Sequence, residues 1–123
     1  MADLSGAWLG TYWQDGNPTR FEATFIQSGN TLTGNILDDS YLGEAQLSGE
    51  VIGRQMHFTK KYLLHKQTPV NYQGTISEDD DFMQGTWDLG MFGSGNWEAH
   101  RNGENLSLEL KNRLENRVPI SVK

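Results

Sequence analysis

The chain has no cysteine among its 123 residues, and this absence excludes several kinds of site. A disulfide framework, a thiolate metal site and a cysteine nucleophile all need that side chain. A chain free of cysteine also fits a reducing compartment, so we expect a cytoplasmic protein. No apolar run approaches the roughly 20 residues that a membrane-spanning helix needs, and the first residues lack the pattern of a secretory signal. We therefore expect no membrane partner.

Basic side chains are scarce as well. Lys and Arg number 10 against 16 Asp and Glu, a net charge of −6, and they are scattered along the chain. Such a surface repels a phosphate backbone, so we expect no nucleic-acid partner. His57, His65 and His100 share no metal-ligand spacing, and the acidic run at residues 78–81 lacks the spaced oxygen ligands of a calcium loop. The sequence predicts no metal, no cofactor and no catalytic residue.

Glycine, by contrast, is abundant, with 14 residues. Many of these glycines stand in one unit, apolar-x-Gly-x-apolar, which places the glycine between two large side chains on the same face of a strand. Glycine in that position lets a sheet bend into a barrel, and it also clears interior volume for a ligand. The unit occurs at Trp8-x-Gly10-x-Tyr12, Leu32-x-Gly34-x-Ile36, Leu47-x-Gly49-x-Val51, Tyr72-x-Gly74-x-Ile76 and Met83-x-Gly85-x-Trp87.

The five glycine units predict five strands, and three further segments complete the set. Residues 20–27, residues 55–63 and a last strand containing Trp97 and Ala99 alternate in the same way, with turn signals between them. Eight strands joined mostly by short hairpins predict an all-β fold, an up-and-down antiparallel barrel over residues 1–103. A two-sheet sandwich is the alternative, but it usually needs longer crossovers.

Residues 104–123 differ from the rest and predict a C-terminal extension. Leu106, Leu110 and Leu114 recur every four positions among charged residues, which indicates a short amphipathic helix. Leu108 also alternates with its neighbours, so a strand is the other interpretation. The apolar side of a helix would pack on the barrel or on another subunit.

Two features make the barrel resemble the calycins, the superfamily that includes lipocalins, fatty-acid-binding proteins and avidins. Gly6-Ala7-Trp8 resembles the lipocalin G-x-W motif, and Arg101 stands where calycins place a basic residue over that tryptophan. The order of segments over residues 5–89 is most similar to that of avidin and streptavidin. The biotin-binding residue set is missing, except that Trp87 falls at a position similar to a biotin-contacting tryptophan. Avidin-like proteins are often tetrameric, which implies a homo-oligomer here.

The inward-facing side chains predict where a ligand would bind. Most are aromatic, as in a small-molecule pocket or in a filled core. Lys60 shares their face, either at an open rim or beside a polar group of a ligand. Gln14, Gln27 and Asp38, also inward at strand ends, fit a polar rim. The predicted ligand-binding residues are Tyr12, Phe58, Lys60, Tyr62, Tyr72 and Trp87.

The leading functional hypothesis is non-enzymatic binding of a small apolar or aromatic ligand inside the barrel, with Lys60 as anchor if the ligand is anionic. Two alternatives remain open. A calycin-type isomerase, cyclase or lyase would use Lys60 or an interior tyrosine to carry protons. A filled barrel would act only through its surfaces, as an oligomer or with a partner.

Overall fold

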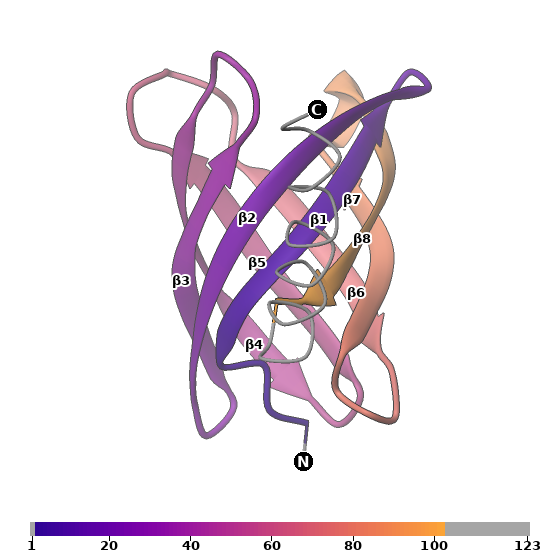
Figure 1. The fold of residues 1–123 in the computed structure, drawn as a ribbon. Coiled ribbons are helices and arrows are strands. Elements are labelled where there is room, and N and C mark those ends of the chain that lie inside the picture. Colours follow the sequence, from indigo (N-terminus) through magenta and orange to yellow (C-terminus); the bar gives the residue numbers. More distant parts are fainter. Residues whose placement is uncertain (1, 103–123) are drawn as a thin grey trace, which may run out of the picture.

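The protein folds into a closed antiparallel barrel, shown by a computed structural model that describes residues 2–102 (Figure 1). Each strand pairs with the next along the chain, and the last strand pairs with the first. The eight-stranded up-and-down barrel predicted from the sequence is confirmed. The strands are β1 (Gly6–Gln14), β2 (Asn17–Ser28), β3 (Thr31–Asp38), β4 (Glu44–Ile52), β5 (Gln55–Tyr62), β6 (Val70–Ile76), β7 (Phe82–Asp88) and β8 (Ser94–Arg101), with a short 3₁₀ helix, η1 (Gly90–Phe92), before β8.

The glycines of the repeated unit bring neighbouring strands close together. A Cβ on Gly85 would stand 1.8 Å from the backbone oxygen of Gln73 on β6, a distance that no side chain tolerates. A Cβ on Gly10 would stand 2.2 Å from Cζ of Phe21, because that ring lies over the glycine. The bending role expected for these glycines therefore fits the structure. The interior space beside Gly10 is filled by an aromatic ring and is not left for a ligand.

One end of the barrel is closed by the predicted tryptophan–arginine pair. Trp8 is fully buried, and the Arg101 guanidinium lies 4.7 Å from the centre of its ring. Arg101 also donates hydrogen bonds to the backbone oxygens of Asp3, Ser5 and Asp80. These bonds fix the first residues of the chain across this end, where Leu4 is fully buried.

The opposite end, which we call the mouth, is formed by four connections. They join β1 to β2, β3 to β4, β5 to β6 and β7 to β8, and they lie together at the upper end of the barrel in Figure 1. The three longer connections, at residues 39–43, 63–69 and 89–93, all lie here. The expected C-terminal helix falls in residues 104–123, which lie outside the described residues. Within residues 2–102, no helix is long and apolar enough to cross a membrane.

Candidate functional site

A buried ion pair lies inside the barrel below the mouth. The Nζ of Lys60, on β5, lies 2.8 Å from both carboxylate oxygens of Asp38, at the end of β3. The two residues are 0 % and 3 % exposed. A buried charge is costly unless it is paired and hydrogen-bonded, and here each group satisfies the other.

Three tyrosines surround this pair. The hydroxyl of Tyr12 donates to Asp38 Oδ2 at 3.1 Å, and the hydroxyl of Tyr62 donates to the same oxygen. The ammonium of Lys60 lies 4.9, 4.7 and 5.6 Å from the ring centres of Tyr12, Tyr62 and Tyr72. Three aromatic faces around an ammonium form the kind of cage that binds cationic ligands. In this protein the chain's own lysine occupies the cage.

The surroundings shift the acidity of the caged groups. Burial lowers the pKa of the Lys60 ammonium, and the Asp38 carboxylate opposes that shift. Burial raises the pKa of the Tyr12, Tyr62 and Tyr72 hydroxyls, and the negative charge of Asp38 raises each of them further. All three tyrosines therefore remain neutral hydrogen-bonding groups at physiological pH.

The sequence predicted the residues of this cluster but not their arrangement. The rim position, one of the two considered for Lys60, is wrong, because its side chain is fully buried and paired with a protein carboxylate. Asp38 was expected at a polar rim but is buried as the partner of Lys60. Alternation showed that both side chains face inward. It could not show that they meet, since β3 and β5 are separated by β4 and the contact crosses the interior.

A small cavity of about 60 Å³ lies at the mouth, above the cage. Four of the six predicted ligand-binding residues line it, and the other two do not. Phe58 lies deeper, stacked on Tyr72 with ring centres 4.7 Å apart, and Lys60 is enclosed by the tyrosines. The sequence did not single out the residues that cover the cavity from the loops, because loop conformation has no periodicity to read. The lining residues are Tyr12, Gln14, Leu42, Tyr62, Gln67, Thr68, Val70, Tyr72, Trp87 and Leu89.

The hydroxyl of Tyr72, one of the residues that line this cavity, has no hydrogen-bond partner among the described residues. Tyr72 is 3 % exposed, and its hydroxyl makes no hydrogen bond with any residue from 2 to 102, whereas the hydroxyls of Tyr12 and Tyr62 both donate to Asp38. The indole nitrogen of Trp87 is also engaged, since it donates to the backbone oxygen of Trp13 at 3.1 Å. Tyr72 thus brings an uncommitted donor to the lining of the cavity.

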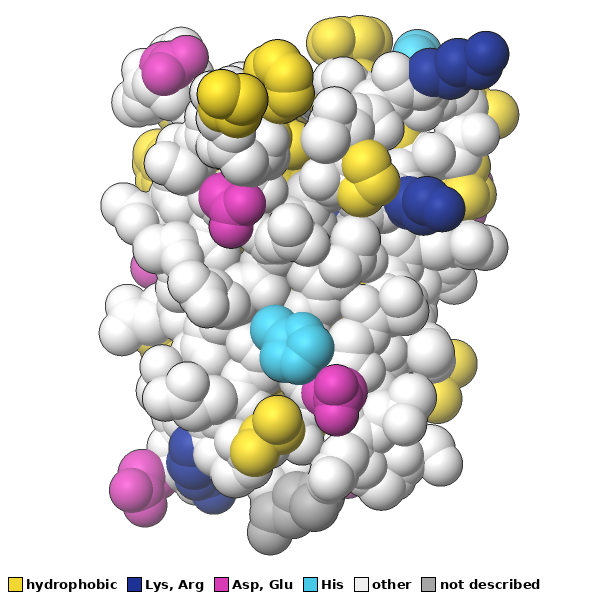
Figure 2. Space-filling view, turned by 180° about the vertical axis from the view of Figure 1, so that it is seen from behind, with side chains coloured by type: hydrophobic (Ala, Val, Ile, Leu, Met, Phe, Trp, Pro, Cys, Tyr) yellow, Lys and Arg dark blue, Asp and Glu magenta, His cyan; other side chains and the backbone are white. Residues whose placement is uncertain are grey.

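Apolar side chains are exposed on the loops around the mouth. Tyr41, Leu64, Met91 and Phe92 are 81 %, 82 %, 95 % and 77 % exposed, and they come from three different connections. Figure 2 shows several hydrophobic side chains at this upper end of the barrel. Exposed apolar groups that gather at one place are typical of a binding region.

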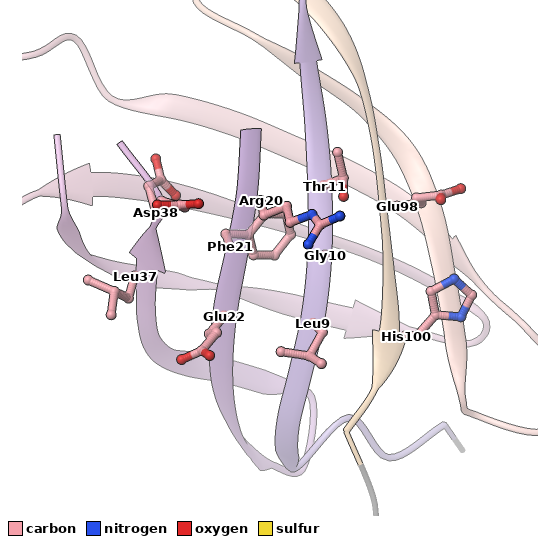
Figure 3. A pocket seen from close by; sticks show the side chains of 11 residues that line it. Leu9, Gly10, Thr11, Arg20, Phe21, Glu22, Leu37, Asp38, Glu98 and His100 are labelled. Carbon is pink, nitrogen blue, oxygen red and sulfur yellow. The ribbon is translucent and has the colours of Figure 1, made fainter. Parts of the chain in front are cut away.

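A larger hollow, of about 630 Å³, lies on the outer face of the barrel and not in its interior. Its floor consists of outward side chains in two rows that cross β8, β1, β2 and β3 (Figure 3). One row is His100, Leu9, Glu22 and Leu37, and the other is Glu98, Thr11, Arg20 and Asp39. This floor is a sheet surface with charges of both signs, so we separate it from the mouth.

The described residues offer few groups for chemistry. No cluster of three or more His, Asp or Glu side chains within residues 2–102 could hold a metal ion. His57 and His100 are exposed. Two of the acidic residues of the β6–β7 turn pair with arginines, Asp80 with Arg54 and Asp81 with Arg101. This turn lies at the closed end, far along the barrel from the mouth.

Comparison with protein-family models finds no match for this chain, and comparison with curated proteins finds none either. The function must therefore be argued from the residues of the barrel.

Proposed function

We propose that the protein binds a small apolar or aromatic molecule at the mouth of the barrel, without catalysing a reaction. The observation that carries this proposal is that Tyr72 lines a cavity while its hydroxyl has no hydrogen-bond partner among residues 2–102. The faces of Tyr62 and Trp87 beside it offer apolar contact area. A ligand here would gain one hydrogen bond within a mostly aromatic wall, which is how small-molecule sites are usually built.

The charge balance below the cavity favours a neutral ligand. Lys60 is compensated by Asp38, so little positive charge is left to attract an anion. Lys60 was first expected to anchor an anionic ligand directly. Asp38 already occupies the place beside Lys60 that the anionic group of such a ligand would take. We propose instead that Lys60 and Asp38 position Tyr12 and Tyr62, while Tyr72 donates to a carbonyl or ether oxygen of the ligand.

The size of the cavity limits what enters without movement. A volume of about 60 Å³ is the share of about two water molecules, whereas an apolar cavity that holds benzene measures about 150 Å³. An aromatic ligand must therefore displace the residues that cover the cavity, chiefly Leu42, Gln67 and Thr68. These belong to two loops of the mouth, and moving them leaves the strands intact.

The test compares two probes and two proteins. Benzamide carries a ring and an acceptor oxygen, whereas toluene carries a ring alone, and binding of each is followed by tryptophan fluorescence and amide chemical shifts. We expect benzamide to bind wild type about five-fold more tightly than Tyr72→Phe, the effect of one net hydrogen bond of about 1 kcal/mol. Toluene should bind both proteins equally.

Tyr41→Phe is the matched control, because it removes a hydroxyl from an exposed tyrosine of the same end. It should leave both affinities unchanged. If neither probe perturbs the residues of the mouth, or if Tyr72→Phe binds benzamide as wild type does, the site is not at Tyr72.

We also propose that the barrel belongs to the calycin superfamily. Its support is the closed eight-stranded antiparallel topology together with the contact of Arg101 with Trp8 at the closed end. A calycin barrel that binds a ligand at its open end would be consistent with the site proposed at the mouth.

A further inference from the structure

The outer hollow on β8, β1, β2 and β3 exposes apolar side chains to solvent. Leu9 and Leu37 are 36 % and 52 % exposed in it, and they stand in the same row of outward side chains. Glu22 stands between the two leucines, and exposed apolar side chains beside a hollow are typical of a surface that another segment covers. We propose that the C-terminal segment of the same chain, residues 104–123, docks in this hollow.

The first support is the place where the barrel ends. Arg101 is the last residue of β8, and the amide of Asn102 donates to the backbone oxygen of Ala7 on β1 at 2.8 Å. The chain therefore leaves the barrel beside β1, two residues after His100, which lines the hollow. The described part of the chain thus ends next to the surface that the segment would cover.

The second support is the pattern of the segment. Leu106, Leu110 and Leu114 would form one stripe of a helix, which could contact Leu9 and Leu37 on either side of Glu22. A helix over residues 105–117 would be about 20 Å long, and nine-residue β1 spans about 30 Å, so the helix fits along the barrel wall. The other interpretation, a strand, finds no place in the described sheet, because closing β8 on β1 leaves no free edge.

The third support is charge. Residues 104–123 carry four basic and three acidic side chains, a small positive excess. The hollow carries Glu22, Asp39 and Glu98 against Arg20, an acidic excess. Opposite signs favour this contact over one between two acidic surfaces.

The proposal is tested on the full chain with one spin label. The sequence has no cysteine, so Asn112→Cys gives a single attachment site, two residues from Leu110 and therefore on the other side of the predicted helix. With a nitroxide on Cys at position 112, we expect loss of the amide signals around Leu9, Thr11 and Glu22 in the ¹⁵N spectrum. Chemical reduction of the nitroxide should restore those signals.

Two controls make the outcomes exclusive. Adding Leu110→Asp to the labelled chain should return the signals near Leu9, because the apolar stripe is broken. A mixture of ¹⁵N-labelled wild type with spin-labelled, isotopically unlabelled protein should show no loss. Loss in the mixture would mean that the segment of a second copy fills the hollow. Loss at the mouth, near Met91, or no loss at all would equally overturn the proposal, and none of these results bears on binding at Tyr72.

Discussion

Replacing Asp38 by asparagine should leave the positive charge of Lys60 uncompensated inside the barrel. The substitution keeps the size of the side chain but removes the charge that compensates Lys60, and the side chains of the two residues are 0 % and 1 % exposed. Removing one partner of a buried ion pair typically costs about 3–5 kcal/mol. We expect Asp38→Asn to lower the free energy of unfolding by that amount. Solvent does not screen the pair, because both side chains are buried.

Urea unfolding followed by tryptophan fluorescence measures this loss. For a domain of this size the slope is about 1–3 kcal/mol per molar urea, so the midpoint should fall by about 2 M. The double variant Asp38→Asn with Lys60→Met removes both charges and should recover most of the loss, because neutral replacement of a buried pair is often tolerated. A cost below about 1 kcal/mol for Asp38→Asn would refute the reasoning, since Lys60 would then need no carboxylate.

The tyrosine cage allows a direct extension of this experiment. Lys60→Ala removes three methylenes and the amine, which correspond to n-propylamine, and leaves the three tyrosines and Asp38 in place. Added n-propylamine should raise the stability of Lys60→Ala with increasing concentration, because a ligand that binds only the folded state stabilises it. Propan-1-ol, the neutral match, should do so less. Equal effects of the two would mean that the cage selects shape and not charge.

Three further predictions concern the glycines, the closed end and alkaline pH. Gly85→Ala should cost about 3 kcal/mol or more in urea unfolding, because its Cβ would meet the Gln73 backbone oxygen at 1.8 Å. Gly16→Ala, with open space around it, should cost only the roughly 1–2 kcal/mol of a strained φ. Similar costs for the two variants would contradict the close-approach argument. Arg101→Met should lower the free energy of unfolding by about 2–3 kcal/mol and speed hydrogen exchange of the Leu4 amide, because bonds to three backbone oxygens are lost. Unchanged exchange would mean that Arg101 does not hold the N-terminal residues. Above about pH 10.5, Tyr12, Tyr62 and Tyr72 lose their protons in the unfolded chain but keep them in the folded barrel. The free energy of unfolding should therefore fall by up to about 4 kcal/mol per pH unit, three times the slope for a single group, as measured by urea midpoints across pH. A flat profile would show that these hydroxyls ionise in the folded state.

The strands could be predicted from the sequence because each carries its own signal. Alternation and a glycine every second inward position define β1, and Ser28-Gly29-Asn30 marks the turn into β3 within a few residues. Closure of the sheet followed from the number of strands and the short hairpins. These are local features, and local features can be read along one chain.

The site could be predicted only in part, because its geometry depends on contacts across the barrel. Alternation placed Tyr12, Tyr62 and Tyr72 inside, but the shear of the sheet decides which of them surround Lys60. The sequence also treated Asp38 as a rim residue, since it stands last in its strand. Only the three-dimensional arrangement shows that this carboxylate accepts hydrogen bonds from Lys60 and two tyrosines.

Native mass spectrometry on protein purified gently from its own cells tests the central claim most directly. The native mass is compared with the mass after denaturation, for wild type and for Tyr72→Phe produced in the same way. Binding at the mouth predicts a discrete small mass on the wild-type barrel that is lost on denaturation and reduced in Tyr72→Phe. An excess mass that is equal in both proteins, or none in either, would contradict a ligand held by the Tyr72 hydroxyl.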